Sequence, residues 1–150
     1  MIRLRYSNAH IRDVTELLAA GLEPPLGIRE AKGARRWLSR AGPHRLPDFG
    51  RIWLAKARLD RLRWGTDPGP VLVLLGLLRR ELFRRPPLRL EDLAVNGRDL
   101  IGMGLRPGPR FGEILEELLA RVLTEPSLND RERLLKLVRG ELVDEGREDE

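Results

Sequence analysis

Leucine-rich segments with a helical repeat, separated by glycine and proline, are the feature that most constrains this chain. Leucine supplies 30 of the 150 residues, whereas aromatic residues make up only 5%. Leucine and arginine favour helices, and strands prefer the β-branched and aromatic residues that are scarce here. Apolar residues recur every three or four positions, as they do on one face of a helix. We therefore expect an all-α fold of seven or eight helices.

Glycine and proline mark the ends of these segments. The expected helices cover about residues 8–20, 30–41, 47–64, 70–84, 90–96, 99–103, 109–124 and 129–142. The segment 70–84 is apolar nearly all round in its first half, which predicts a central core helix. Asn129 and Glu132 have the spacing of a capping box at the start of the last helix. We expect a helical body at residues 1–85, a small C-terminal subdomain at 86–143 and an acidic, disordered tail at 144–150.

The net charge of +5 combines a basic body with an acidic end. Residues 141–150 hold six acids and one base, whereas residues 1–140 hold 27 bases and 17 acids. Of the basic residues 25 are arginine, either because of genome composition or because arginine binds phosphate in a bidentate manner. No segment resembles a targeting signal, and the longest apolar run, residues 71–78, is too short to span a bilayer. We expect a soluble, cytoplasmic protein that does not enter membranes.

The sequence offers little for catalysis. It contains no cysteine and only two histidines, His10 and His44, neither of which has clustered carboxylates nearby in the sequence. The motifs of P-loop nucleotidases, zinc proteases and serine hydrolases are absent. We therefore expect no catalytic residue, no metal ligand and no cofactor in this chain.

The most distinctive stretch, residues 90–115, joins short helical segments through glycines and then starts a longer helix at residues 107–109. Backbone N–H groups at a helix start, together with the helix dipole, favour an anion. Gly112 falls inside the expected helix, where glycine costs about 1 kcal/mol relative to alanine. Close approach by another helix or by a sugar-phosphate chain would each justify it, so both remain open. The candidate phosphate-binding residues are Arg98, Arg106, Gly108, Arg110 and Gly112.

The same stretch carries a specific pattern of spaced residues. It consists of Asp92-Leu-Ala-Val-Asn-Gly97-Arg-Asp-Leu-Ile, then Pro107-Gly108-Pro-Arg-Phe-Gly112-Glu-Ile-Leu, then Val122, Pro126, Asn129 and Arg131-Glu132. This pattern closely resembles the C-terminal region of bacterial class II CCA-adding tRNA nucleotidyltransferases and their poly(A) polymerase relatives. Similarity upstream is weaker: residues 4–20 resemble the end of the family's middle region, and residues 35–61 resemble its helical body.

In the enzymes of this family, catalysis and tRNA binding belong to different parts of the chain. The catalytic head, with its metal-binding carboxylates and glycine-serine phosphate loop, and the nucleotide-selecting neck have no counterpart in this sequence. The body and tail hold the tRNA acceptor and TΨC region through backbone contacts. The resemblance thus implies a chain that binds tRNA or another structured RNA and is not catalytic alone, with Mg²⁺ and CTP or ATP belonging to a head. Alternatively, the chain is a helical subunit that docks a separate nucleotidyltransferase head.

Basic residues in the segment 29–63 support RNA binding, since they number 11 against three acids. Arg51 and Arg58 are seven residues apart and therefore share one face of a helix. An ordinary solvated helix face would show the same pattern of basic residues. The candidate RNA-binding residues here are Arg35, Arg36, Arg51, Arg58 and Arg61. We expect the tryptophans, Trp37, Trp53 and Trp64, to pack in the core or between subdomains rather than to stack on bases.

Overall fold

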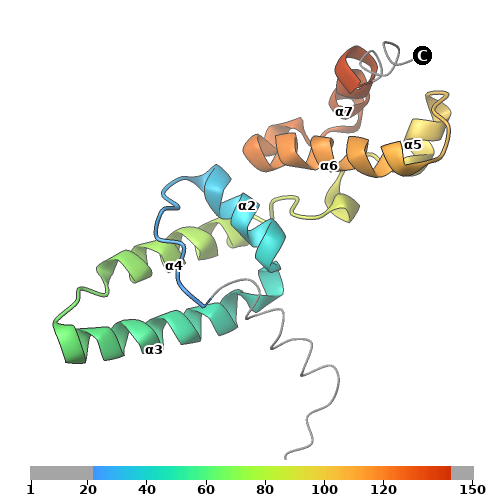
Figure 1. Cartoon of the computed structure of the whole chain (residues 1–150). Helices are drawn as coiled ribbons and strands as arrows, with labels where there is room; N and C mark the ends of the chain where they lie inside the picture. The colour runs from blue at the N-terminus through green and yellow to red at the C-terminus, as the bar shows by residue number, and fades with distance from the viewer. Residues whose placement is uncertain (1–21, 143–150) are drawn as a thin grey trace, which may run out of the picture. The chain divides into compact units, whose positions relative to one another are not determined.

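The computed structural model describes residues 22–142, and of residues 141 and 142 it describes the backbone alone. This part of the chain is helical and contains no strand, which confirms the predicted all-α class (Figure 1). It holds six α-helices; the helix predicted at 8–20 and the acidic tail predicted at 144–150 lie outside the described residues. The chain divides into two compact units, an N-terminal unit of residues 1–84 and a C-terminal unit of residues 85–150.

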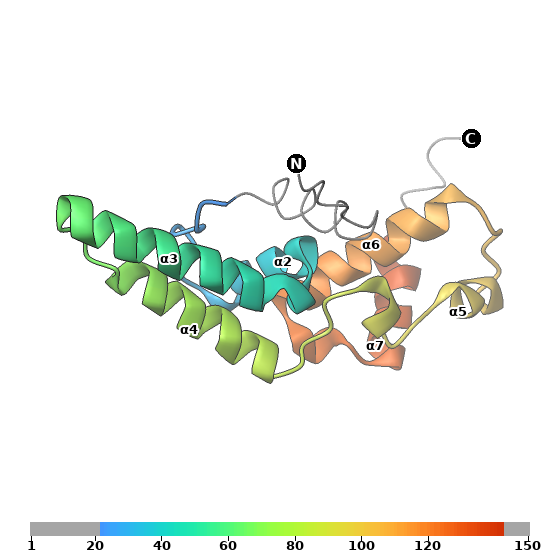
Figure 2. The ribbon, with the colours of Figure 1, turned by 90° about the horizontal axis from the view of Figure 1, so that it is seen from below.

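Three helices build the described part of the N-terminal unit: α2 (Ala31–Ala41), α3 (Leu46–Trp64) and α4 (Gly69–Phe83). A 3₁₀ turn, Pro43–Arg45, joins α2 to α3. Gly65 ends α3 with a φ of +68°, a left-handed conformation that glycine adopts readily. Helices α3 and α4 lie side by side, as Figures 1 and 2 show, and α2 packs against α4.

An aromatic cluster forms the centre of this unit. Trp37, Phe49 and Trp53 are buried, with ring centroids 5.2 to 5.4 Å apart. Such pairs add about 0.5–1.5 kcal/mol to the stabilisation from burial alone. The core position predicted for the tryptophans is therefore confirmed for Trp37 and Trp53. It is wrong for Trp64, which stands at the end of α3 with 74% of its surface exposed.

Helix α4 is less central than its sequence predicted. Leu74, Leu75 and Leu78 face the core, but Leu72 and Val73 are 54% and 74% exposed. The reason is geometric, because α2 and α3 pack against α4 within the described chain, and the buried residues of α4, which also include Val71 and Glu81, lie on one face of the helix. The first half of the helix is apolar nearly all round and yet buries one face.

A buried ion pair fastens α2 to α4. Arg35 Nη1 lies 2.7 Å from Glu81 Oε2, and both side chains are almost fully buried. The second carboxylate oxygen of Glu81 accepts a hydrogen bond from Arg84 at 2.9 Å. Each oxygen of the buried carboxylate thus has a charged donor, as a carboxylate removed from water requires.

The C-terminal unit contains α5 (Gly97–Gly102), α6 (Pro109–Thr124) and α7 (Arg131–Leu137). The helix predicted at 90–96 is a single 3₁₀ turn, Leu90–Asp92, and a second such turn, Pro126–Leu128, joins α6 to α7. The last predicted helix ends early as an α-helix and continues as a π turn, Val138–Leu142.

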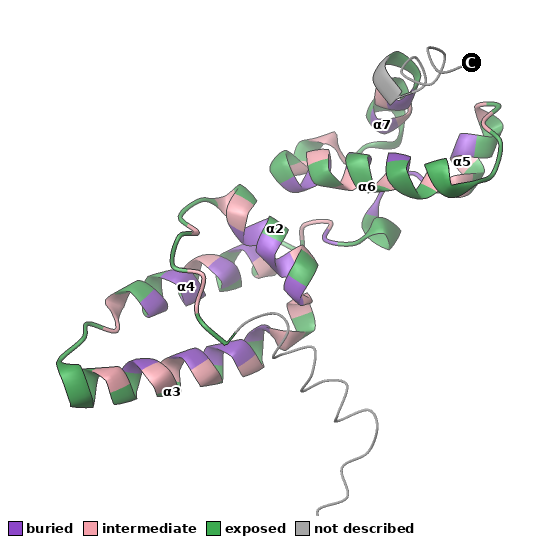
Figure 3. Ribbon diagram, in the orientation of Figure 1, coloured by how far each residue is buried: buried purple, intermediate pink, exposed green. Residues whose placement is uncertain are grey.

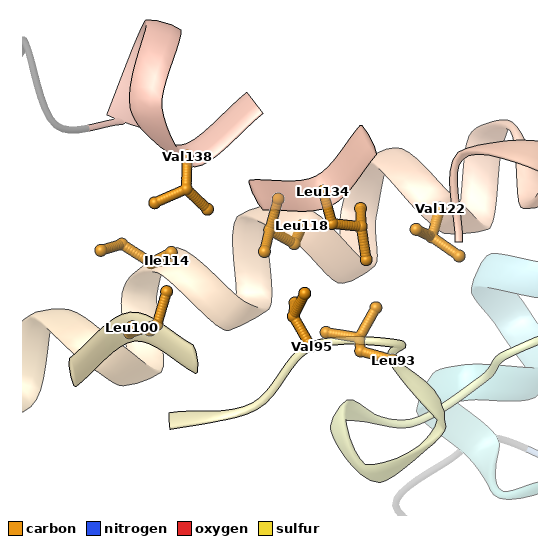
Figure 4. Close-up of a cluster of buried hydrophobic side chains, with 8 residues drawn as sticks. All are labelled: Leu93, Val95, Leu100, Ile114, Leu118, Val122, Leu134 and Val138. Atoms are coloured by element: carbon orange, nitrogen blue, oxygen red, sulfur yellow. The ribbon is translucent and has the colours of Figure 1, made fainter. Parts of the chain in front are cut away.

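One hydrophobic cluster holds this unit together. Helix α6 supplies Ile114, Leu118 and Val122 at four-residue spacing, so that one face of the helix is buried (Figure 3). Figure 4 shows the partner side chains converging on this face from α5, from α7 with the turn that follows it, and from the segment before α5. The whole cluster consists of Leu93, Val95, Leu100, Ile114, Leu118, Val122, Leu134 and Val138.

Candidate nucleic-acid interface

The start of α6 differs from the starts of its neighbours in the C-terminal unit. Asn96 caps α5 and Asp130 caps α7, each by accepting a hydrogen bond from a backbone N–H of the first turn. Helix α6 begins after Gly108, which has no side chain to offer, and no side chain caps it. A long helix without an N-cap side chain presents the positive end of its dipole to the surroundings.

Two of the predicted site glycines lie in open space. A Cβ atom added at Gly108 or Gly112 would meet no other atom within 4 Å apart from its chain neighbours and the backbone of its own helix. Gly108 has an extended φ of 176°, which any residue can adopt. Within the described chain, therefore, no helix–helix corner accounts for Gly112, and the packing explanation finds no support there.

Contact between α5 and α6 brings three predicted arginines onto adjoining elements. A Cβ atom at Gly97, the first residue of α5, would lie 3.6 Å from the Phe111 ring in the first turn of α6. Arg98, Arg106 and Arg110 sit on these two helix starts and on the loop between them, and all three are exposed. The arrangement combines a helix start with flanking cations, and oxyanions bind to such combinations.

Asn129 holds the segment that leads into α5. Its side-chain oxygen accepts a hydrogen bond from the Ala94 N–H, and its side-chain nitrogen donates to the Asp92 carbonyl, both at 2.9 Å. The side chain therefore acts on residues 35 and 37 positions earlier in the chain. The predicted role of Asn129 as a helix cap is wrong, because Asp130 takes that position and bonds the Arg133 N–H.

A second pair fixes α5 to the start of α7. Arg131 reaches Asp99 with two guanidinium nitrogens, at 2.6 and 3.1 Å. The other oxygen of Asp99 accepts the Asn96 N–H at 2.9 Å. The hydrogen bond from Arg131, followed by the one from Asn96, lowers the pKa of Asp99 below its usual value. Asn129 and Arg131 were visible as part of the sequence pattern, but their structural role required the fold.

The arginines predicted in the segment 29–63 fall into different environments. Arg58 and Arg61 are exposed on α3, and Arg36 is exposed on α2. Arg51 is exposed and pairs with Asp48 at 3.1 Å, an interaction that contributes at most about 1 kcal/mol at a surface. Arg35 requires a correction, since its guanidinium is buried against Glu81. It joins two helices and does not belong to an exposed binding surface.

Between residues 22 and 142, no three histidine, aspartate or glutamate side chains come together in a way that could hold a metal ion. Over the same part of the chain, no helix combines the length and the apolar character needed to cross a membrane.

The C-terminal unit is similar to known proteins. Residues 87–138 match the family model for tRNA nucleotidyltransferase domain 2. A segment of 52 residues is 44% identical to the CCA-adding enzyme of Limosilactobacillus fermentum. This part of the chain resembles a CCA-adding enzyme. The resemblance inferred from the sequence is thereby confirmed for the C-terminal unit.

The match is partial on both sides. It covers 35% of this chain and 13% of the CCA-adding enzyme. Because the family model begins at residue 87, the weaker similarity proposed upstream remains a prediction. No solved structure matches the chain.

Proposed function

We propose that the C-terminal unit binds tRNA, or another structured RNA, through phosphate groups at the start of α6. The observation that carries this proposal is the uncapped helix start with two glycines in open space and exposed arginines beside it. The match to tRNA nucleotidyltransferase domain 2 supports RNA as the ligand. Phosphate contacts position a protein on RNA and are indifferent to base sequence, so we expect recognition of shape.

The test is a charge reversal at the two arginines nearest the helix start, Arg106→Glu with Arg110→Glu. Binding of unmodified tRNA to the full chain should weaken steeply with salt, because each neutralised phosphate releases counterions. The double variant should bind at least tenfold more weakly, and the slope of log K against log salt should fall by about 1.5, the loss of about two phosphate contacts.

A matched control separates a local effect from an effect of net charge. Lys136 and Arg139 are exposed in the same unit, and reversing both changes the net charge by the same amount. The control should lose much less affinity and keep most of the salt slope. Equal losses in the two double variants, or no tRNA binding by the native chain at low salt, would contradict the proposal.

Nucleotidyl transfer, with its Mg²⁺ and CTP or ATP, would belong to a separate catalytic head. A second function, docking of such a head, is favoured by one observation in the N-terminal unit. An open groove of about 860 Å³ runs along α4, and the exposed Val73 lines it together with Leu26 and Leu77. If α4 docks a head, co-purification with a co-expressed nucleotidyltransferase head should be lost in a Val73→Asp variant and retained in the reversed-arginine variant.

A further inference from the structure

The end of α3 carries an exposed aromatic ring among basic side chains. Trp64 is the last residue of this helix and is 74% exposed, whereas the other two tryptophans are buried. The guanidinium of Arg63 lies 5.6 Å from the centroid of the Trp64 ring. Figure 3 shows the last turn of α3 as exposed. The ring therefore keeps most of its surface accessible, and a cation is close to it.

Basic residues lead along the helix to this ring. Arg58 and Arg61 are three residues apart, as are Arg61 and Trp64, so each pair are neighbours on the surface of α3. All three are exposed. The acid in this stretch, Asp60, is occupied by Lys56 at 3.1 Å. The aromatic ring therefore lies near exposed arginines, and the acid on the same turns of the helix, Asp60, already forms an ion pair.

We propose that Trp64 is a stacking platform for an unpaired base of an RNA strand whose phosphates lie along Arg58 and Arg61. Single-stranded nucleic acids are bound by aromatic rings on which bases stack and by cations that follow the backbone. Arginine also stacks on aromatic and base planes, which gives Arg63 a place beside the stack. This inference rests on the proposed RNA binding, but it adds a second contact with a different chemistry.

An exposed tryptophan beside leucines can also serve protein docking, and Leu59 and Leu62 are exposed on the same end of α3. The charges favour RNA, because four basic residues and one acid occupy residues 56–64. Protein interfaces are depleted of charged residues at their core, whereas basic residues precede the ring and stand beside it here. Native affinity for octa-adenylate after loss of the Trp64 ring would instead favour docking of a protein at this end of α3.

The experiment compares two strands of equal charge, octa-adenylate and an eight-nucleotide strand without bases, on the full chain. Trp64→Leu keeps an apolar side chain and removes the ring. It should weaken octa-adenylate binding at least fivefold, the lower end of the effect of one stacked base, and leave binding of the abasic strand unchanged. Trp64→Phe keeps a ring and should lose less. Because Trp64 is largely exposed, both variants should retain the native far-UV circular dichroism.

Fluorescence gives an independent readout. Acrylamide should quench Trp64 selectively, since Trp37 and Trp53 are buried, and octa-adenylate should protect it while the abasic strand should not. Equal losses on both strands, or native affinity for octa-adenylate in Trp64→Leu, would overturn the platform. The proposed function would survive that result if the Arg106 and Arg110 reversal still weakened tRNA binding at least tenfold, and would fail separately if it did not.

Discussion

Replacing Gly112 with alanine should stabilise the fold and weaken RNA binding at the same time. Gly112 lies within α6, is exposed, and does not adopt a left-handed backbone conformation. A Cβ atom there meets nothing within 4 Å beyond its own helix and chain neighbours. The substitution therefore removes the conformational cost of an interior glycine, about 0.5–1 kcal/mol, without introducing a clash.

The size of the stability effect follows from the size of the unit. For a domain of 60–100 residues, 1 kcal/mol corresponds to roughly 4–8 °C in Tm, so Gly112→Ala should raise the Tm of the C-terminal unit by about 2–8 °C. If a phosphate approaches the backbone at this position, the added methyl group should weaken tRNA binding about tenfold. That loss is the order of one charge-assisted hydrogen bond, about 1.5 kcal/mol.

Gly76 provides the matched control. It is exposed within α4, and a Cβ atom there also meets nothing within 4 Å. Gly76→Ala should stabilise the N-terminal unit similarly and leave the tRNA affinity unchanged. All three tryptophans lie in the N-terminal unit, so fluorescence follows that unit and far-UV circular dichroism follows both. A Gly112→Ala variant that binds tRNA as tightly as the native chain would refute the close approach of a phosphate.

Three further predictions concern the scaffold. Asn129→Ala removes two hydrogen bonds and should destabilise the C-terminal unit by about 1–3 kcal/mol in urea denaturation, while Asn129→Asp, which keeps the acceptor, should cost less. Glu81→Ala removes the carboxylate that pairs with the buried Arg35 guanidinium and should cost about 3–5 kcal/mol, whereas the double replacement Arg35→Met with Glu81→Leu should recover most of that loss. A double variant as unstable as Glu81→Ala would contradict this prediction. The pKa of Asp99 is lower in the folded chain than in the unfolded chain. The stability that its ionised carboxylate gives the fold is therefore present above the unfolded pKa of about 4 and is lost as the pH falls through the lower folded pKa. A Tm series below pH 5 should be flatter in Asp99→Asn than in the native chain.

The sequence predicted the α-helical class and most helix ends, because leucine periodicity, glycine and proline act locally. Helix α6 begins and ends at the predicted residues, and α2, α3 and α4 do so within one residue. The exposure of Leu72 and Val73 could not be predicted in this way. An apolar helix indicates burial, but how much of its surface is covered depends on how many neighbours pack against it.

The candidate site shows the same division. The glycines and arginines around α6 were found from local pattern, and the structure places them at an exposed helix start. Arg35 could not be separated from its exposed neighbour Arg36 by charge alone, because its partner Glu81 is 46 residues away. Trp64 was misassigned for a related reason, since tryptophan is most often buried and only the position at the end of α3 exposes it.

The bridge made by Asn129 has a consequence for how the C-terminal unit folds. Its two hydrogen bonds close a loop of 35 to 37 residues, and the chain entropy lost on closing such a loop must be offset before the contact stabilises anything. Residues 92–95 should therefore become ordered only when the start of α7 is in place. We expect their amide hydrogens to exchange together with those of α7, as one cooperative unit, and a chain cut before residue 129 to lose the ordered entry into α5.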